Sequence, residues 1–266
     1  MKDKQRRQNG TITCCMITKN EERNIGRSLK SVSFCDRIIV IDDYSTDNTA
    51  SIARKHGAAV IKRRFDTFSA QKQFAVSQSK TDWVLMLDAD EVISDDLKNA
   101  VIAALAAEPD DDIAGFFIGI RSNFLGAWIR YSGWDIRQLR LFRRSKAGYD
   151  KSILHERIVH TGKTAALTGY IMHYSYPDVD TVIRKVALYS TLSAKDKYSG
   201  PHRLTGGRIF RFAFREPCNV FFRYFITRQG FRDGGHGFLL ACYMSILEFF
   251  TQVRRLLREA GLATEL

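Results

Sequence analysis

Four short apolar segments, each followed by a stretch with the character of a helix, constrain the fold of this chain most strongly. The segments are Thr11–Ile17, Arg37–Asp43, Ala58–Lys62 and Asp82–Asp88. Strands that are apolar on both faces are typical of a parallel sheet covered by helices on each side. The alternation of strand and helix therefore predicts a doubly wound α/β fold with a mostly parallel sheet, in which ligands bind outside the carboxyl ends of the strands.

The helices are indicated by apolar periodicity and by end signals. The first presents one apolar face, made of Ile25, Leu29 and Val32. The others are predicted between the capping segment 44–49 and Gly57, around residues 69–79, and over residues 94–107.

The pattern changes after residue 107. Three further strands are predicted at residues 112–120, 137–144 and 168–176, with aromatic and Gly-containing connections between them. From about Asp178 the chain becomes helical and rich in Arg and Phe, and we place a boundary there. We therefore expect a domain over residues 1–177, with halves at about 11–107 and 108–177, and a helical region over residues 178–266.

Composition limits the partners of this chain. Its 266 residues are enough for one large domain with a proper core, and its net charge of +12 suits an anionic partner. It contains no RNP, KH, zinc-finger or helix-turn-helix signature, so we expect no nucleic-acid partner. The five cysteines show neither a disulfide pattern nor zinc-ligand spacing, and no signal peptide is evident, so we expect a reduced cytosol.

Carboxylates follow the second predicted strand. Asp42 and Asp43 end this strand, and Asp47 lies just beyond it, before the next helix. A carboxylate in this position can accept hydrogen bonds from a ribose or a base, or it can cap the helix. The residues alone leave both interpretations open.

A second acidic group, Asp88, Asp90 and Glu91, follows the fourth strand. Carboxylates this close repel one another, so they need a cation unless all of them point into water. Along an extended chain, the D-x-D spacing directs both Asp side chains to one side. There they can share Mg²⁺ or Mn²⁺, which typically binds one or two carboxylates together with substrate phosphates.

Several segments resemble a known family. "MITKNEERNI", "VIDDYSTDNT" and "LMLDADE", in this order and spacing, resemble the inverting family 2 glycosyltransferases of GT-A fold. The later segments "GAWIRYSGWDIRQLRLFRR", "HERIV" and "IMHYSY" resemble a narrower branch, the lipopolysaccharide core β-glucosyltransferases. The resemblance covers about residues 11–197. It implies a GT-A catalytic domain whose first half binds the nucleotide sugar and whose second half binds the acceptor.

The resemblance also assigns donor-binding residues. Asp43 would hold the uracil or ribose of a UDP-sugar, with Asn20 and Glu21 nearby. Asp88 and Asp90 would be the D-x-D pair, with Asp90 facing the divalent cation.

Three further assignments stay open. Glu91 either shares the metal or only shapes the loop. Lys72 either reaches the nucleotide or diphosphate, or lies on a solvated helix face. His173 either ligates the metal or is a structural residue of its strand.

Inverting transfer needs a base that removes the proton of the acceptor hydroxyl as its oxygen attacks the anomeric carbon opposite the diphosphate. Glu156 is predicted to be this base, with Asp135 and Asp150 as the next candidates. The alternative is that Glu156 pairs with Arg157 or Arg140 on a sheet face. Arg140 and Arg143 are predicted to stabilise the departing diphosphate or to bind an anionic acceptor.

Residues 206–258 mix Phe, Tyr and Arg at close intervals and contain no Lys. The most apolar stretch, 238–247, is well short of the ~20 residues that span a bilayer. Such a region either lies in a membrane interface or packs on the catalytic domain. We favour the interface, because a lipid-linked acceptor is met at the bilayer surface. The interfacial residues would be Phe210, Phe212, Phe214, Phe221, Phe222 and Phe225, with Arg208, Arg211, Arg215 and Arg223.

The sequence thus predicts a metal-dependent inverting glycosyltransferase that moves a hexose, glucose from UDP-glucose, to a lipid-linked saccharide such as the lipopolysaccharide inner core. We expect a cytoplasmic protein attached peripherally to the inner face of a Gram-negative plasma membrane. One alternative is a family 2 enzyme of capsule or exopolysaccharide synthesis that uses another nucleotide sugar. Another is a non-catalytic membrane-surface protein on a GT-A scaffold.

Overall fold

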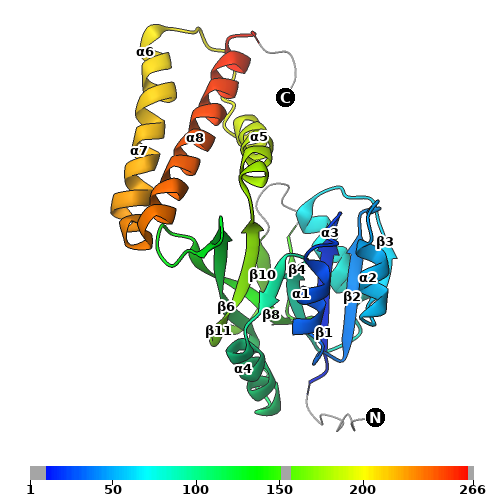
Figure 1. Ribbon diagram of the computed structural model, residues 1–266. Coiled ribbons are helices and arrows are strands. Elements are labelled where there is room, and N and C mark those ends of the chain that lie inside the picture. The colour runs from blue at the N-terminus through cyan, green and yellow to red at the C-terminus, as the bar shows by residue number, and fades with distance from the viewer. Residues whose placement is uncertain (1–9, 151–156, 263–266) are drawn as a thin grey trace. The chain divides into compact units, whose positions relative to one another are not determined.

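The computed structural model describes residues 10–150 and 157–262, and the chain divides into two compact units. Unit 1 comprises the chain up to Ile120 together with Ile136–His173, and unit 2 comprises Arg121–Asp135 together with the chain from Tyr174. Both can be followed in Figure 1. The mostly helical unit therefore includes a segment, 121–135, that lies well before residue 178 in the sequence.

A mixed sheet forms the centre of unit 1, with the strand order β3–β2–β1–β4–β8–β6–β11–β5. Its first four strands are parallel: β3 (Ala59–Lys62), β2 (Arg37–Asp42), β1 (Ile12–Thr18) and β4 (Trp83–Asp88). These strands lie within one or two residues of their predicted positions, and the parallel half confirms the doubly wound layer.

The other half of the sheet is added to the free side of β4. It contains β8 (Asp135–Arg143), β6 (Ile113–Phe124), β11 (Lys163–Tyr176) and β5 (Glu91–Ile93), and β7 (Ala127–Trp128) pairs with β6. β8 is antiparallel to β4, and β5 is antiparallel to β11. The sequence predicts three of these strands but not the short β5 and β7.

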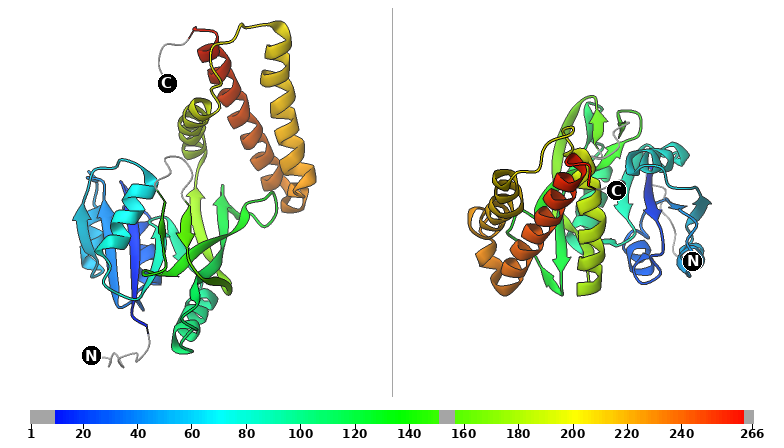
Figure 2. Two further views of the ribbon diagram at one scale, coloured as in Figure 1. Left: turned by 180° about the vertical axis from the view of Figure 1, so that it is seen from behind. Right: turned by 90° about the horizontal axis from the view of Figure 1, so that it is seen from above.

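Helices cover both faces of the sheet, as the period-2 alternation of the strands requires. Ile12, Cys14 and Met16 of β1 point into one core, which contains α1 (Ile25–Ser31), α2 (Thr49–Lys55) and α4 (Asp95–Ala106). Cys15 points into the opposite core, which contains α3 (Phe68–Gln78) and residues of the hairpin β9 (Ala147–Tyr149) and β10 (Ile158–His160). Figure 2 shows these layers from two more directions.

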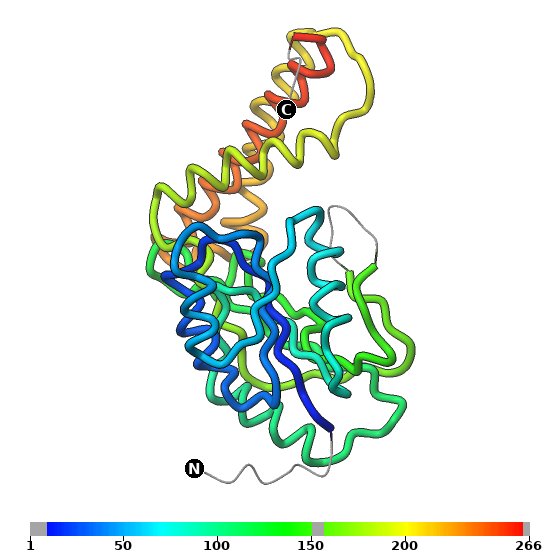
Figure 3. Tube along the Cα trace, turned by 90° about the vertical axis from the view of Figure 1, so that its right-hand side faces the viewer, coloured from blue at the N-terminus to red at the C-terminus, as the bar shows by residue number. Residues whose placement is uncertain are grey.

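Unit 2 is built on three helical segments. α5 (Val179–Asp196) and α8 (Gly234–Glu259) contact each other, and between them in sequence lies a helical segment that we call the arm, residues 206–227. The arm consists of α6 (Gly206–Ile209), the π-helix η1 (Phe210–Arg215), α7 (Glu216–Phe222) and the π-helix η2 (Arg223–Thr227). It runs along α8, to which it is joined by the 3₁₀ turn η3 (Gly230–Asp233) (Figure 3).

Segment 121–135 belongs to unit 2 because its aromatic side chains pack there. The rings of Phe124 and Trp134 lie 5.8 and 5.2 Å from the ring of Tyr176, and Phe124 lies 5.9 Å from Tyr243. We call these four residues the aromatic cluster. Asp233 adds polar contacts, since its carboxylate accepts hydrogen bonds from the backbone of residues 130 and 131 at 3.1 and 3.0 Å.

Glu259 fixes the end of α8. Its side chain is 1% exposed, and it accepts hydrogen bonds from Arg255 (2.8 Å), Ser199 (2.9 Å) and Arg208. Burial raises the pKa of Glu259, but the hydrogen bonds from Arg255 and Ser199 outweigh it and lower the pKa below its usual value. The carboxylate therefore contributes stability above about pH 4.3, the unfolded value, and this contribution is lost as the pH falls through the folded pKa.

We expect Glu259→Gln to destabilise α8 by about 2 kcal/mol at neutral pH, because two Arg side chains lose their buried anion. Hydrogen exchange of the α8 amides measures this loss, which should shrink as the pH is lowered. Glu216→Gln is the matched control, since Glu216 lies 3.5 Å from Arg215 in a more exposed pair. Equal losses in the two variants would contradict the role of Glu259.

Within residues 10–150 and 157–262, no helix combines the length and the apolar character needed to cross a membrane.

Candidate active site

Three parallel strands bring the predicted acidic groups to one edge of the sheet. β1 is central, with Thr18 opposite Asp42 of β2 and Ile17 opposite Asp88 of β4. Both acidic groups thus lie at the carboxyl ends of the two strands that flank β1, where a doubly wound sheet binds its ligands.

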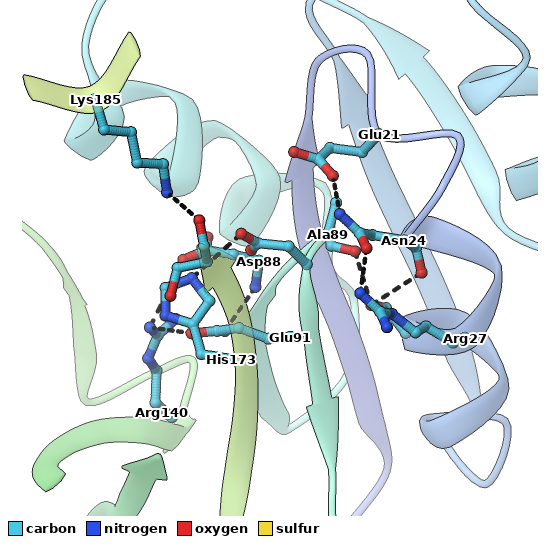
Figure 4. A network of polar contacts seen from close by, with 12 residues as sticks. Glu21, Asn24, Arg27, Asp88, Ala89, Glu91, Arg140, His173 and Lys185 are labelled. Carbon is cyan, nitrogen blue, oxygen red and sulfur yellow. Dashed lines mark hydrogen bonds and ion pairs between the residues drawn. The ribbon is translucent and has the colours of Figure 1, made fainter. Parts of the chain in front are cut away.

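Asp88 is the centre of a network of charges. Nζ of Lys72 lies 3.0 Å from its Oδ1, and a guanidinium nitrogen of Arg140 lies 3.7 Å from its Oδ2. Burial raises the pKa of Asp88, but the positive charges of Lys72 and Arg140 outweigh it, so the pKa lies well below its usual range. Asp88 is therefore an anion at any physiological pH. Figure 4 shows the side chains of Asp88, Arg140, Glu91 and His173 grouped together.

Lys72 is buried, with a side chain that is 4% exposed. The alternative of a Lys on a solvated helix face is therefore wrong. Helix α3 packs across the sheet face, so the side chain of Lys72 reaches the end of β4.

Glu91 is fully buried, and both of its oxygens have partners in the protein. Oε2 accepts the backbone N–H of Asp88 at 2.8 Å, and Oε1 accepts a hydrogen bond from Arg140 at 2.9 Å. Burial raises the pKa of Glu91, and Arg140 opposes this rise. These contacts favour the interpretation in which Glu91 shapes the loop and does not ligate a metal.

Asp90 has a different environment from Asp88. The chain turns at Ala89 and Asp90, so the extended D-x-D geometry that the sequence suggests is not present. Oδ2 of Asp90 lies 3.3 Å from Nε2 of His173, which β11 places opposite Glu91 across the β5 pairing. Burial lowers the pKa of His173, but the hydrogen bond and charge of Asp90 outweigh it and raise the pKa above its ordinary value.

The first strand–helix turn is tied to the loop after β2. Asn20 adopts a left-handed conformation (φ 53°), its N–H donates to Ser45 at 2.9 Å, and its Oδ1 accepts from Thr46 at 2.8 Å. Glu21 donates its N–H to Thr49 at 2.7 Å. Its Oε2 accepts from Asn24, a pair that Figure 4 also shows.

The three Asp residues near β2 divide between the two open interpretations. Asp42 accepts from the N–H of Ser45, and Asp47 accepts from Thr49, so both organise the loop before α2. Asp43 instead accepts from Nζ of Lys19 at 2.6 Å and from the N–H of residue 65 at 3.0 Å. The hydrogen bond from Lys19 lowers the pKa of Asp43. Asp43 therefore does not cap the helix.

A cavity of about 590 Å³ opens beside Asp88. Among its described lining residues, Asp88 is the only acidic one, whereas Lys72, Arg137, Arg140 and Arg157 are cationic. The other lining residues are Phe117, Gln138, Leu139, Tyr149, Ile158 and His160. Arg137 lies within a predicted strand, but no sequence pattern marks it as a site residue, since only the pairing of β8 with β4 brings it near Asp88.

Among the predicted site residues that the structure describes, Arg143 lies away from this group. Arg143 pairs with Trp83, at the opposite end of β4 from Asp88. It donates to the carbonyls of Ile113 and Pro109 and stacks on the Trp83 ring, so the prediction that it binds diphosphate or acceptor is corrected to a structural role. Glu156 lies outside the described residues. The residue that follows it, Arg157, lines the cavity.

The groups near the sheet edge fit a divalent cation in part. Within the described residues, no three His, Cys, Asp or Glu side chains converge as a complete coordination sphere. However, Mg²⁺ and Mn²⁺ in nucleotide sites take only one or two carboxylates, and the substrate phosphates and waters supply the rest. Asp90, a partly exposed carboxylate beside His173, fits this requirement.

The sheet order and the helices on both of its faces define an α/β protein of the doubly wound class, and comparison with known proteins specifies the family. Residues 13–167 match the model of glycosyl transferase family 2, which is more than half of the chain. The chain therefore belongs to glycosyltransferase family 2 and is a glycosyltransferase with a GT-A fold, as the sequence predicts.

Two relatives indicate which members of glycosyltransferase family 2 this chain is similar to. The chain is 31% identical over 259 residues to the lipopolysaccharide core biosynthesis glycosyltransferase LpsC of Rhizobium meliloti (strain 1021), with 94% of this chain and 93% of the relative covered. It is 30% identical over 262 residues to an uncharacterized glycosyltransferase of Rickettsia typhi, covering 94% and 88%. The chain is thus a homologue of a lipopolysaccharide core enzyme.

A solved structure supports the fold. The mannosyltransferase PcManGT from Pyrobaculum calidifontis, in complex with GDP-Man and Mn²⁺, superposes with a TM-score of 0.53. The two sequences are 12% identical, and 93% of this chain and 87% of the other are covered.

Proposed function

We propose that this enzyme moves a hexose from a UDP-sugar, with UDP-glucose as the first candidate, to a saccharide of a lipid-linked acceptor such as the lipopolysaccharide inner core. The observation that carries this proposal is the cavity beside Asp88, whose cationic lining suits a diphosphate and an anionic acceptor. The name of the relative LpsC supports the acceptor class.

The donor would lie along the edge formed by β2, β1 and β4. Asp43, held by Lys19 and by the backbone of residue 65, would accept from the ribose or uracil, with Asn20 and Glu21 in the adjoining turn. Lys72 and Arg140 would face the diphosphate and stabilise the charge that develops as UDP departs.

A divalent cation, Mg²⁺ or Mn²⁺, would be held by Asp90, with His173 beside it and with Asp88 at the adjoining strand end. Such a cation acts as a Lewis acid on the leaving diphosphate. The protein's own part is to orient these groups, and Glu91 does so by holding the Asp88 backbone N–H.

In the transfer step, the acceptor oxygen forms a bond to the anomeric carbon as the bond to the diphosphate breaks on the opposite face. Glu156 would take the proton of the acceptor hydroxyl. Its position in sequence, directly before the cavity residue Arg157, supports this assignment. We place the reaction on the cytoplasmic side of the membrane, with the enzyme attached peripherally.

Thermal stabilisation tests the donor assignment. A donor that binds only the native state raises the melting temperature. Across a panel of nucleotide sugars with Mn²⁺ present, UDP-glucose should give the largest shift and should be slowly hydrolysed. A larger shift with a GDP- or dTDP-sugar would point to a different family 2 activity. No shift and no hydrolysis with any donor would favour a non-catalytic scaffold.

A further inference from the structure

Two rows of exposed residues recur every four positions along the arm. One row is apolar and consists of Phe210, Phe214, Cys218, Phe222 and Ile226. The row beside it is rich in Arg and consists of Arg211, Arg215, Asn219, Arg223 and Thr227. Every member of both rows is exposed.

A period of four does not fit a regular α-helix. At 3.6 residues per turn, a row with this spacing drifts by about 40° every four residues, so between residues 210 and 226 it would turn by about 160°, nearly to the opposite face of the helix. The π-helical hydrogen bond spans one residue more than the α-helical one, which widens the turn. η1 has six residues and η2 has five, and these two segments offset the drift. The two rows therefore run nearly straight along the arm.

The buried side of the arm shows which of the predicted interfacial residues are available. The rings of Phe221 and Phe225 lie 5.6 and 5.7 Å from Phe238 of α8, so both contribute to helix packing. Phe212 is half-buried against Arg255, and Arg208 binds Glu259. Of the six Phe residues predicted to be interfacial, Phe210, Phe214 and Phe222 are the exposed ones.

Helix α8 continues the apolar surface. Leu239, Ile246, Phe250 and Leu257 are exposed and recur at intervals of seven and four, which places them on one helix face. A second cavity of about 590 Å³ is lined by the opposite face of α8 and, on the arm, by Arg223 of the Arg row and by four further residues, Phe212, Glu216, Val220 and Tyr224. The apolar row lies two positions around the arm from these four residues. The apolar row of the arm and the apolar face of α8 form two apolar stripes. Both stripes therefore lie on the side of these two helices that faces away from this cavity.

We infer that these two apolar stripes, bordered by the Arg row of the arm, form a docking surface for an anionic lipid bilayer. Straight rows suit a planar partner, because all members can reach the same depth. Phe side chains can enter the boundary between headgroups and acyl chains, while Arg side chains contact lipid phosphates. The Arg row is opposed only by Glu216, 3.5 Å from Arg215, among the described ion pairs.

This surface deepens the proposed function, because it would bring the enzyme to a lipid-linked acceptor, and in that respect it rests on that proposal. The vesicle experiments below contain no sugar, so they test the surface independently of the transfer reaction.

Sedimentation with vesicles tests the surface. The full chain should bind phosphatidylcholine vesicles that contain phosphatidylglycerol, and high salt should release part of it. The variant F214S/F222S should bind about tenfold more weakly or worse. R211S/R215S/R223S should bind anionic vesicles with an affinity about a hundredfold lower.

Matched controls are I183S/L188S on α5 and K30S/R54S/K55S on unit 1, which replace side chains at exposed positions outside the proposed surface. Equal losses in controls and test variants, or no binding by the full chain, would overturn the inference.

Cys218 provides a native reporter within the apolar row. Cys14, Cys15 and Cys35 are buried, so in a C242S background Cys218 is the thiol accessible to a water-soluble maleimide. Anionic vesicles should slow its modification at least about tenfold. In C218S/C242S, an introduced A187C thiol on α5 should react at an unchanged rate. Protection of Cys218 that grows with protein concentration and needs no vesicles would assign the surface to a second copy of the chain and overturn the inference.

Discussion

Replacing Arg140 with Leu is expected to lower the free energy of unfolding by about 3–5 kcal/mol, because it leaves the fully buried carboxylate of Glu91 without its cation. The substitution should also disturb the position of Asp88 in the active site, since Glu91 accepts a hydrogen bond from the backbone N–H of Asp88. Chemical denaturation of the wild type and the variant measures the effect.

The pH dependence distinguishes this cause from lost packing. Without Arg140, the pKa of Glu91 should rise further than burial already raises it. An acidic group whose pKa is higher in the folded than in the unfolded state stabilises the protein at pH values below its unfolded pKa, about 4.3. This stabilisation is lost as the pH rises through the folded pKa. The deficit of the variant should therefore be largest at neutral pH and shrink in acid.

A second substitution supplies the control. Gln at position 91 can still accept the Asp88 N–H but carries no charge, so E91Q/R140L should recover most of the stability that R140L loses. A double variant no more stable than R140L, with a deficit that does not change with pH, would show that Arg140 acts through packing alone.

Glu156→Gln is expected to lower kcat by roughly 10²–10⁴-fold while the affinity for the donor stays nearly unchanged, because the substitution keeps the shape and removes the proton acceptor. Steady-state transfer assays give kcat, and UDP binding measured by calorimetry gives the donor affinity.

The same assays on Asp135→Asn and Asp150→Asn identify the base if it is not Glu156. Asp135 forms an ion pair with Arg121 at 3.2 Å, so its loss should affect stability as well. A Glu156→Gln enzyme with more than about a tenth of the wild-type rate would move the role to another residue.

The parallel half of the sheet could be predicted from the sequence because each of its strands is apolar on both faces and is followed by a helix. The apolar pattern of β1, β2 and β4 in the sequence therefore matches the burial that these strands have in the folded sheet. The short strand β5 could not be predicted, because its three residues gain their structure from pairing with β11.

The sequence shows where the site lies but does not show which role each of its residues has. The acidic strand ends are visible in the sequence, yet the turn at Ala89 and Asp90 separates the partners of Asp88 from those of Asp90. Nothing local shows that Lys72 is buried or that Arg143 lies at the far end of β4. Both facts follow from how α3 and β8 pack in the fold.

The aromatic cluster has a consequence for how the chain is made. Phe124 and Trp134 pack against Tyr243, which is synthesised about 110 residues after Trp134. At about 5–20 residues per second, roughly 5–20 s pass between the synthesis of Trp134 and that of Tyr243, although Tyr176, the other partner of these rings, is made earlier. Helices form within about a microsecond, so translation and not folding sets the length of this interval. During it, segment 121–135 is an apolar stretch of nascent chain that a chaperone can bind.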